Sequence, residues 1–310
     1  MSSKEIPMDT REIDKPPFND RYTIVKISPE EEEIGGKIHK LFRTELRRVH
    51  PWTINRHGVV TIVKNGREIG GIENENISPE LARVLDGFNM VERFLPDFIG
   101  QGNQFVRSNM GLFEFHTQWA GEESLHGQIL EILLEQTGHK PEEEVIKEYH
   151  ENLTRVWEPP FRTTRQIVAH AAFQERGTEV GYEALAIRAI EEGAPKTAEI
   201  LRLIGSDESF HGKGYTKVTR IFYETDPEGT IDDVLYVASE FRMPAENLHP
   251  DREQWVRDLV GVGALSKELL REGVIYRTLK AFDFIPESVA RKTADGFLKR
   301  RKTGSKVATA

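Results

Sequence analysis

Apolar residues recur every three to four positions along most of the chain, which is the spacing of one helix face. Ser28-Pro29-Glu30 and Ser78-Pro79-Glu80 each combine a capping Ser with Pro at the first helical position, so helices are predicted to begin there. The pattern predicts that these helices run to about His50 and Gly100. A β-rich run between them ends in Asn65-Gly66, a signal typical of a hairpin. The chain is therefore predicted to be nearly all α.

The two ends of the chain differ from the middle in composition. Residues 1–20 are polar and contain prolines, which predicts a mobile N-terminal arm. Residues 301–310 are polar and basic, which predicts a mobile tail. We expect residues 21–300 to form a single helical domain.

Ionisable residues interrupt the apolar stripe of four predicted helices near the middle of each helix. The stripes are Leu81, Leu85, Phe88, Glu92, Leu95, Ile99; Leu112, Phe115, Trp119, Glu123, His126, Leu130, Leu133; Val168, Ala171, Glu175, Thr178, Tyr182, Leu185, Ala189; and Leu201, Ile204, Glu208, His211, Tyr215, Val218, Phe222. Burying such groups without partners costs several kcal/mol each. The interruptions therefore need a shared explanation.

The spacing of these residues supplies that explanation. The chain repeats a helix with one Glu followed by a helix with Glu-x-x-His, because Glu123 follows Glu92 by 31 residues and Glu208 follows Glu175 by 33. Glu and His three apart lie on one helix face. Two such pairs packed as a bundle bring together four carboxylates and two imidazoles, the ligand set of ferritin-like di-iron and di-manganese proteins. The predicted fold is a ferritin-like four-helix bundle with a dinuclear metal site and additional flanking helices.

The amino-acid composition limits the partners, the cellular location and the kinds of metal site that are expected. Fifty-one acidic and 42 basic residues give a net charge of −9, which argues against a nucleic-acid partner. No apolar run is long enough to span a membrane and no signal peptide is evident, so a cytoplasmic protein is expected. The absence of cysteine excludes thiolate zinc sites and cysteine-ligated clusters. Position 122 is Glu122, so the two histidines of a zincin are missing. Oxygen-rich ligation favours iron or manganese, and iron is preferred.

Three motifs, "GEESLHG", "FQERGT" and "GSDESFHG", resemble those of the soluble acyl-carrier-protein desaturases, the stearoyl type. "VERFLP" resembles that family's first ligand helix, and the similarity extends from about Trp52 to Asp226. The resemblance implies that two iron ions are bound by Glu92, Glu123, His126, Glu175, Glu208 and His211. It also implies that Thr178 lies beside the oxygen-binding face, and that Trp52 and Asp207 link the iron site to the surface as an electron route.

The same resemblance implies dioxygen-dependent desaturation of an acyl chain on acyl carrier protein, with a ferredoxin-type electron donor and a homodimeric enzyme. The sequence departs from the plant-type motifs at Ser124-Leu125 and Ser209-Phe210, where that type has polar or basic residues. These positions are expected to point away from the metals. The segment from Pro96 to Glu123 is shorter than in the plant type, as in bacterial members.

Other interpretations stay open at this point. A hydroxylase or oxidase on the same scaffold would use the same ligands. An iron-oxidising storage protein would share the bundle but is usually shorter, and a ribonucleotide reductase radical subunit would need a tyrosine near the iron, such as Tyr215. His116 and His170 are expected to be core or channel residues. The cations Lys37, Lys40 and Arg47 can form a solvated face or a docking surface for an acidic carrier.

The internal repeat makes one prediction by itself. If the two helix pairs are related by a pseudo-twofold axis, Asp207 should face His126 and Glu122 should face His211. A carboxylate commonly accepts the outer N–H of a metal-binding imidazole. Both contacts are expected at about 2.7 to 3.0 Å.

Overall fold

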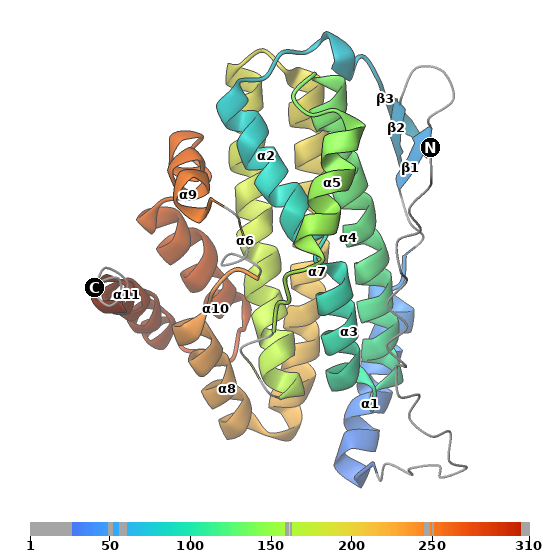
Figure 1. The fold of residues 1–310 in the computed structure, drawn as a ribbon. Coiled ribbons are helices and arrows are strands. Elements are labelled where there is room, and N and C mark those ends of the chain that lie inside the picture. Colours follow the sequence, from blue (N-terminus) through green and yellow to red (C-terminus); the bar gives the residue numbers. More distant parts are fainter. Residues whose placement is uncertain are drawn as a thin grey trace, which may run out of the picture.

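The computed structural model describes residues 27–48, 52–55, 61–158, 161, 163–244, 249 and 251–304 (Figure 1). These residues form helices and one small sheet, as the sequence predicts. The elements are α1 (Pro29–Leu41), the π-helical turn η1 (Phe42–Leu46), β1 (Trp52–Asn55), β2 (Thr61–Lys64), β3 (Arg67–Ile69), the short 3-10 helix η2 (Ile72–Asn74), α2 (Pro79–Glu92), α3 (Leu95–Val106), α4 (Met110–Gln136), α5 (Glu142–Asn152), α6 (Thr164–Glu191), α7 (Pro195–Thr225), α8 (Pro227–Glu240), α9 (Arg252–Gly261), the π-helical segment η4 (Leu269–Tyr276), α10 (Arg277–Ala281) and α11 (Glu287–Gly304).

Four helical columns make up the bundle. The long helices α4, α6 and α7 form three of them, and α2 followed by α3 forms the fourth (Figure 1). Helix α1 packs against α4 and α7, and the small sheet lies on the same side of the bundle. Helices α8, α10 and α11 and η4 cover the side formed by α6 and α7, and α9 packs against α2. The predicted all-α bundle with flanking helices is therefore confirmed.

The predicted helix starts are confirmed, but both predicted helix ends are wrong. Ser28 and Ser78 cap α1 and α2 through their side chains. Helix α2 stops at Glu92 because Pro96 lacks an N–H and its ring would clash with the carbonyl four residues earlier. Helix α1 gives way to η1 and then to extended backbone at Arg47. Gln118 of α4 holds this segment, since it contacts the backbone of Leu46 and Arg48 at 3.1 and 2.9 Å.

The predicted hairpin lies within a three-stranded antiparallel sheet. Asn65 and Gly66 both have positive φ, as a tight two-residue hairpin turn requires. The sequence analysis did not identify β1 as a strand. The register pairs Trp52 of β1 with Lys64 of β2, so the two side chains lie on one face of the sheet.

The hydrophobic core is divided into two clusters along the bundle axis. On α4 one cluster contains Leu112 to Ala120 and the other contains Ile129 to Leu134. Helices α6 and α7 are divided in the same way, on either side of Glu175 and Glu208. A polar layer in the middle of the bundle therefore separates the two clusters.

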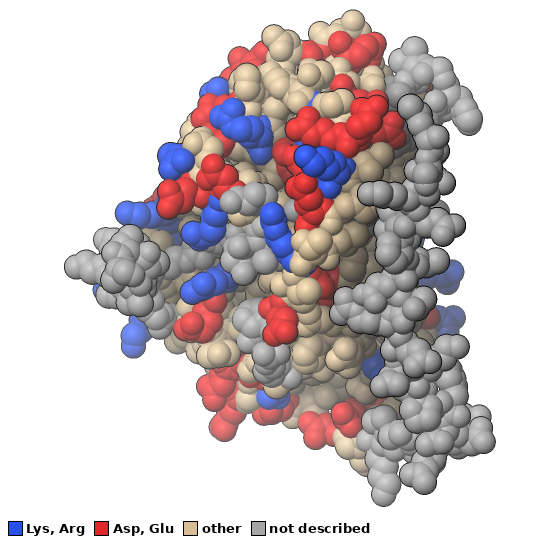
Figure 2. All heavy atoms as spheres, viewed as in Figure 1, with Lys and Arg blue, Asp and Glu red and all other residues tan. Residues whose placement is uncertain are grey.

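The described surface carries both signs of charge. Figure 2 shows acidic and basic side chains interspersed over the visible face. None of the described helices is long and apolar enough to cross a membrane. The predicted mobile arm at 1–20 and residues 305–310 of the predicted tail lie outside the described residues, while 301–304 continue α11.

Candidate metal centre

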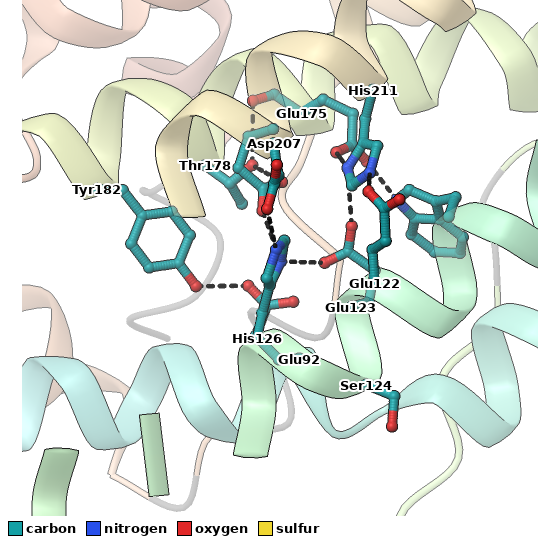
Figure 3. Close-up of polar contacts among 12 residues, drawn as sticks. Glu92, Glu122, Glu123, Ser124, His126, Glu175, Thr178, Tyr182, Asp207 and His211 are labelled. Atoms are coloured by element: carbon teal, nitrogen blue, oxygen red, sulfur yellow. Dashed lines mark hydrogen bonds and ion pairs between the residues drawn. The ribbon is translucent and has the colours of Figure 1, made fainter. Parts of the chain in front are cut away.

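The polar layer brings together all six residues predicted to bind metal (Figure 3). Each is at least 95% buried. They come from the four columns of the bundle: Glu92 from the end of α2, Glu123 and His126 from α4, Glu175 from α6, and Glu208 and His211 from α7. The two Glu-x-x-His helices therefore lie where their spacing predicts.

Potential ligand atoms fall into two overlapping groups, and within each group they lie within 4.8 Å of one another. Glu123 and Glu208 belong to both groups. Glu92 belongs only to the group with His126, and Glu175 only to the group with His211. The arrangement can hold two metal ions, with Glu123 and Glu208 placed between them.

Both imidazoles direct Nδ1 toward these carboxylates. Nδ1 of His126 lies 3.3 Å from Glu123 Oε2 and 3.0 Å from Glu208 Oε1. Nδ1 of His211 lies 3.1 Å from Glu123 Oε1 and 3.3 Å from Glu175 Oε2. A neutral imidazole with its proton on Nε2 would therefore present the Nδ1 lone pair to a metal ion.

The outer nitrogen of each imidazole meets the acid predicted from the repeat. Nε2 of His211 lies 2.8 Å from Glu122 Oε2, within the predicted range. Nε2 of His126 lies 3.2 Å from Asp207 Oδ2, slightly beyond that range. An outer carboxylate sets the tautomer and ring orientation of a metal-binding histidine. Both predicted contacts are confirmed, and both favour the Nδ1 lone pair facing inward.

The pKa shifts in the cluster show that its buried carboxylates lack compensating positive charge. Burial, together with neighbouring carboxylates, raises the pKa of Glu92 and of Glu175 well above the usual value. Burial alone would lower the pKa of the imidazoles, but the carboxylates around His126 and His211 raise each pKa well above its usual value. Metal ions or protons must therefore compensate the buried carboxylates.

The atoms and charges of the site fit two divalent ions. Oε1 of Glu123, Oε2 of Glu175, Oε1 of Glu208 and Nδ1 of His211 are buried without a hydrogen-bond partner. With the outer acids Glu122 and Asp207 there are six carboxylates, which carry −6 when ionised. The cations paired with the outer acids are Arg48 and Lys64, which contribute +2. The remaining −4 equals the charge that two divalent ions neutralise.

Asp207 joins the cluster to Trp52, as the resemblance implies. The indole N–H of Trp52 donates to Asp207 Oδ2 at 2.6 Å. Lys64 Nζ and Arg48 Nη2 contact Asp207 Oδ1 at 2.8 and 3.1 Å. Burial by itself raises the pKa of Asp207, but His126 and Lys64 hold it well below the usual value. Asp207 is therefore an ionised link between one imidazole and the sheet.

Three further side chains contact the candidate ligands. Thr178 donates to Glu208 Oε2 at 2.9 Å, so its hydroxyl lies in the cluster as expected. Tyr182 donates to Glu92 Oε1 at 2.6 Å, and Trp119 Nε1 donates to Glu175 Oε1 at 3.1 Å. Tyr182 and Trp119 were predicted only as members of the apolar stripes, with no role at the site. Their positions on the stripes beside Glu175 and Glu123 are the signal that could have identified them.

The departures inside the Glu-x-x-His motifs do not reach the cluster. Figure 3 shows Ser124 pointing away from the carboxylates. Phe210 packs under Arg48, whose guanidinium carbon lies 4.1 Å from the ring centre. Arg48 and Lys64 were not predicted, because no local spacing connects them with the motifs.

A narrow apolar cavity of about 50 Å³, part of it open to solvent, lies beside the centre. Its described lining is Phe98, Gln101, Gly102, Phe105, Val106, Leu112, His116, Trp119, Trp157, Ile167, Val168, His170, Ala171, Gln174 and Tyr215. This lining contains no Asp, Glu, Lys or Arg, and burial lowers the pKa of His116 and of His170 to about 4. Trp119 both lines the cavity and contacts Glu175, so the uncharged cavity reaches the carboxylate cluster.

Comparison with known proteins agrees with this site. A family model described as fatty acid desaturase matches residues 74–261, more than half of the chain, and all six candidate ligands lie in that range. The chain belongs to the fatty acid desaturase family.

Individual relatives in this family are plant proteins. A chloroplastic stearoyl-[acyl-carrier-protein] 9-desaturase from Solanum commersonii is 30% identical over 140 residues, 44% of this chain and 35% of the relative. An acyl-[acyl-carrier-protein] 6-desaturase from Thunbergia alata is 27% identical over 137 residues, 44% of this chain and 35% of the relative. The chloroplastic 9-desaturase from Helianthus annuus is 29% identical over 182 residues, 55% of this chain and 45% of the relative. The chain thus spans between about a third and half of the length of these relatives.

Proposed function

We propose that this protein is a di-iron, dioxygen-dependent desaturase that introduces a double bond into an acyl chain carried on acyl carrier protein. One observation carries the proposal: Trp119 lines an uncharged cavity and donates a hydrogen bond to Glu175 of a buried four-carboxylate, two-imidazole cluster. The family membership and the activities for which the plant relatives are named support the same reaction.

In this proposal, Glu92, Glu123, His126, Glu175, Glu208 and His211 hold two iron ions. Iron suits a site with mostly oxygen ligands and one nitrogen per metal. Iron held here would activate dioxygen with two external electrons and so would supply the oxidant needed to remove two hydrogens from an unactivated acyl chain. Thr178 donates a hydrogen bond to Glu208, and its hydroxyl is proposed to lie beside the oxygen-binding face.

The cavity gives the substrate its orientation. An acyl chain placed there contacts aromatic and aliphatic side chains and excludes water from the Trp119 side of the centre. His116 and His170 are neutral near pH 7, because burial lowers the pKa of each to about 4. An acyl chain that enters the cavity therefore does not have to displace water from a charged imidazole.

Electrons enter from the side of the small sheet in this proposal. Trp52, Asp207 and His126 form a continuous hydrogen-bonded series from the small sheet to the cluster. A ferredoxin-type protein is proposed as the donor. The homodimer and the cytoplasmic location remain predictions from the sequence.

Product analysis tests the reaction. Iron-loaded protein is incubated aerobically with ferredoxin, its reductase and acyl carrier proteins that bear saturated chains of different length, and the chains are analysed by mass spectrometry. Loss of two hydrogens is expected. Gain of one oxygen would replace the proposal by a hydroxylase, and iron uptake beyond two ions per chain with unchanged acyl chains would replace it by a storage protein.

A further inference from the structure

Arg48 lies at the junction of the two outer carboxylates. Its Nε contacts Glu122 Oε1 at 2.9 Å, and its Nη2 contacts both Glu122 and Asp207, the latter at 3.1 Å. The Arg48 backbone N–H is fixed by Gln118 at 2.9 Å, and the guanidinium stacks on Phe210. The side chain is 23% exposed, so a largely buried cation is held from several directions.

The two outer carboxylates do not depend on Arg48 equally. Asp207 also receives Lys64 Nζ at 2.8 Å and the Trp52 indole N–H at 2.6 Å. Glu122, which is fully buried, has Arg48 as its Lys or Arg partner in the described part of the chain. Removal of Arg48 would leave Glu122 with His211 as its side-chain hydrogen-bond partner among the described residues, whereas Asp207 would keep two donors besides His126.

Each outer carboxylate acts on a different half of the centre. Glu122 orients His211, which belongs with Glu175, and Asp207 orients His126, which belongs with Glu92. A buried carboxylate that loses its paired cation is no longer held in position, and it then no longer fixes the imidazole. The consequences of losing Arg48 should therefore concentrate on one metal site.

We propose that Arg48 is a positioning residue that holds the His211 half of the centre in its metal-binding geometry through Glu122. Lys64 has no equivalent role for the His126 half, because Arg48 and Trp52 also hold Asp207. Arg48 touches no candidate ligand, so it acts only through the outer carboxylates. This inference rests on the proposed metal centre, but it does not depend on the acyl reaction.

Co²⁺ titration of the metal-free full chain separates the two halves. In the His126→Ala background, the site that contains His211 should have the higher Co²⁺ affinity. In the His211→Ala background, the site that contains His126 should have the higher Co²⁺ affinity. Arg48→Met is expected to weaken Co²⁺ binding about 10- to 100-fold in the His126→Ala background, the usual effect of losing an outer partner. The expected loss in the His211→Ala background is less than about threefold, because Lys64 and Trp52 still hold Asp207.

Lys64→Met is the matched control, because it removes a cation from the same network but leaves Glu122 with Arg48 and Asp207 with Arg48 and Trp52. A loss smaller than about tenfold is expected from it in both backgrounds. Circular dichroism checks that each variant is folded. Arg48→Lys is a second variant, which keeps the positive charge but cannot contact both Glu122 and Asp207 as a guanidinium does. An intermediate loss of Co²⁺ affinity is expected from it. Equal losses from Arg48→Met in both backgrounds, or no loss in either, would overturn the assignment. A wild-type chain that binds no Co²⁺ would overturn it together with the metal centre. Intact Co²⁺ results with no acyl product would count against the reaction alone.

Discussion

Trp52 and Asp207 are 155 positions apart in the sequence, yet the Trp52 indole N–H donates to Asp207 at 2.6 Å. The contact joins the first strand of the small sheet to the middle of α7. The sheet register also places Lys64 opposite Trp52, so both donors reach the same carboxylate. The sheet therefore has a direct role in the organisation of the metal centre.

Replacement of Asp207 by Asn should preserve the fold and weaken metal retention. The amide keeps the shape of the carboxylate but leaves Lys64 and Arg48 without their shared anion. We expect a 10- to 100-fold loss of affinity, as for other outer partners of metal-binding histidines. A competition titration with a chromophoric chelator measures it. Trp52→Phe is the control, since it removes one N–H and keeps every charge. Wild-type affinity in the Asn variant would contradict the role of Asp207.

Variants of a carboxylate shared by both ligand groups should bind fewer metal ions per chain than variants of a carboxylate that belongs to one group. Glu123 lies in both ligand groups, so Glu123→Gln should reduce the content of both ions. Glu92 lies in one group, so Glu92→Gln should reduce the content from two ions toward one. Elemental analysis after dialysis measures ions per chain. Equal stoichiometry in the two variants would argue against a shared position for Glu123.

Tyr182 should contribute to the site through Glu92. Tyr182→Phe removes a donor at 2.6 Å from a buried carboxyl group, which costs about 1 to 3 kcal/mol of stability in the metal-free protein. Thermal or denaturant unfolding measures the loss. Tyr215→Phe is a matched control, because Tyr215 packs against Phe115 and Trp119 and makes no ligand contact among the described residues. A larger loss from Tyr215→Phe would contradict the importance of the Tyr182 contact.

The raised pKa values of His126 and His211 predict opposite pH effects on metal-free and metal-loaded protein. A folded-state pKa above the unfolded value of about 6.5 gives stability that is complete below pH 6.5 and is lost as pH rises through the folded pKa. Glu92 and Glu175, whose pKa values are also raised, act in the same direction. The metal-free protein should therefore melt at lower temperature as pH rises above about 6.5.

Metal affinity should rise over the same pH range, because each ion must displace protons from the cluster. Melting curves with chelator and with Co²⁺, measured from about pH 6 to 9, check both trends. The same measurements on His126→Ala provide the control, with a smaller pH dependence expected. Metal affinity that does not change with pH would contradict proton displacement.

A bulky residue in the cavity should change the substrate and leave the metals in place. Ala171 lines the cavity, so Ala171→Trp shortens the space available to an acyl chain. The expected result is a shift of kcat/KM toward shorter chains, measured by competition between acyl carrier proteins of different chain length. Metal content equal to that of the wild type is the internal control. An unchanged chain-length preference would mean that the acyl chain lies elsewhere.

The sequence by itself determined the features that depend on local spacing. Glu and His three apart share a helix face, Ser before Pro starts a helix, and Asn-Gly turns a hairpin, because each is decided within a few residues. The repeat of these units was enough to predict the six-residue cluster. It also predicted the pairs Glu122–His211 and Asp207–His126, since a pseudo-twofold arrangement follows from two equivalent helix pairs.

Tertiary structure alone decided which other groups complete the site. Tyr182 reaches Glu92 across 90 positions, and Arg48 reaches Glu122 across 74, so no periodicity in the sequence connects these pairs. The side-chain contacts of Arg48 depend on where α1 ends, and Gln118 of another helix fixes that segment. The cavity depends on the gap that α3, α4, α6 and α7 leave between them. Such features arise from packing between distant elements, whose geometry local patterns do not encode.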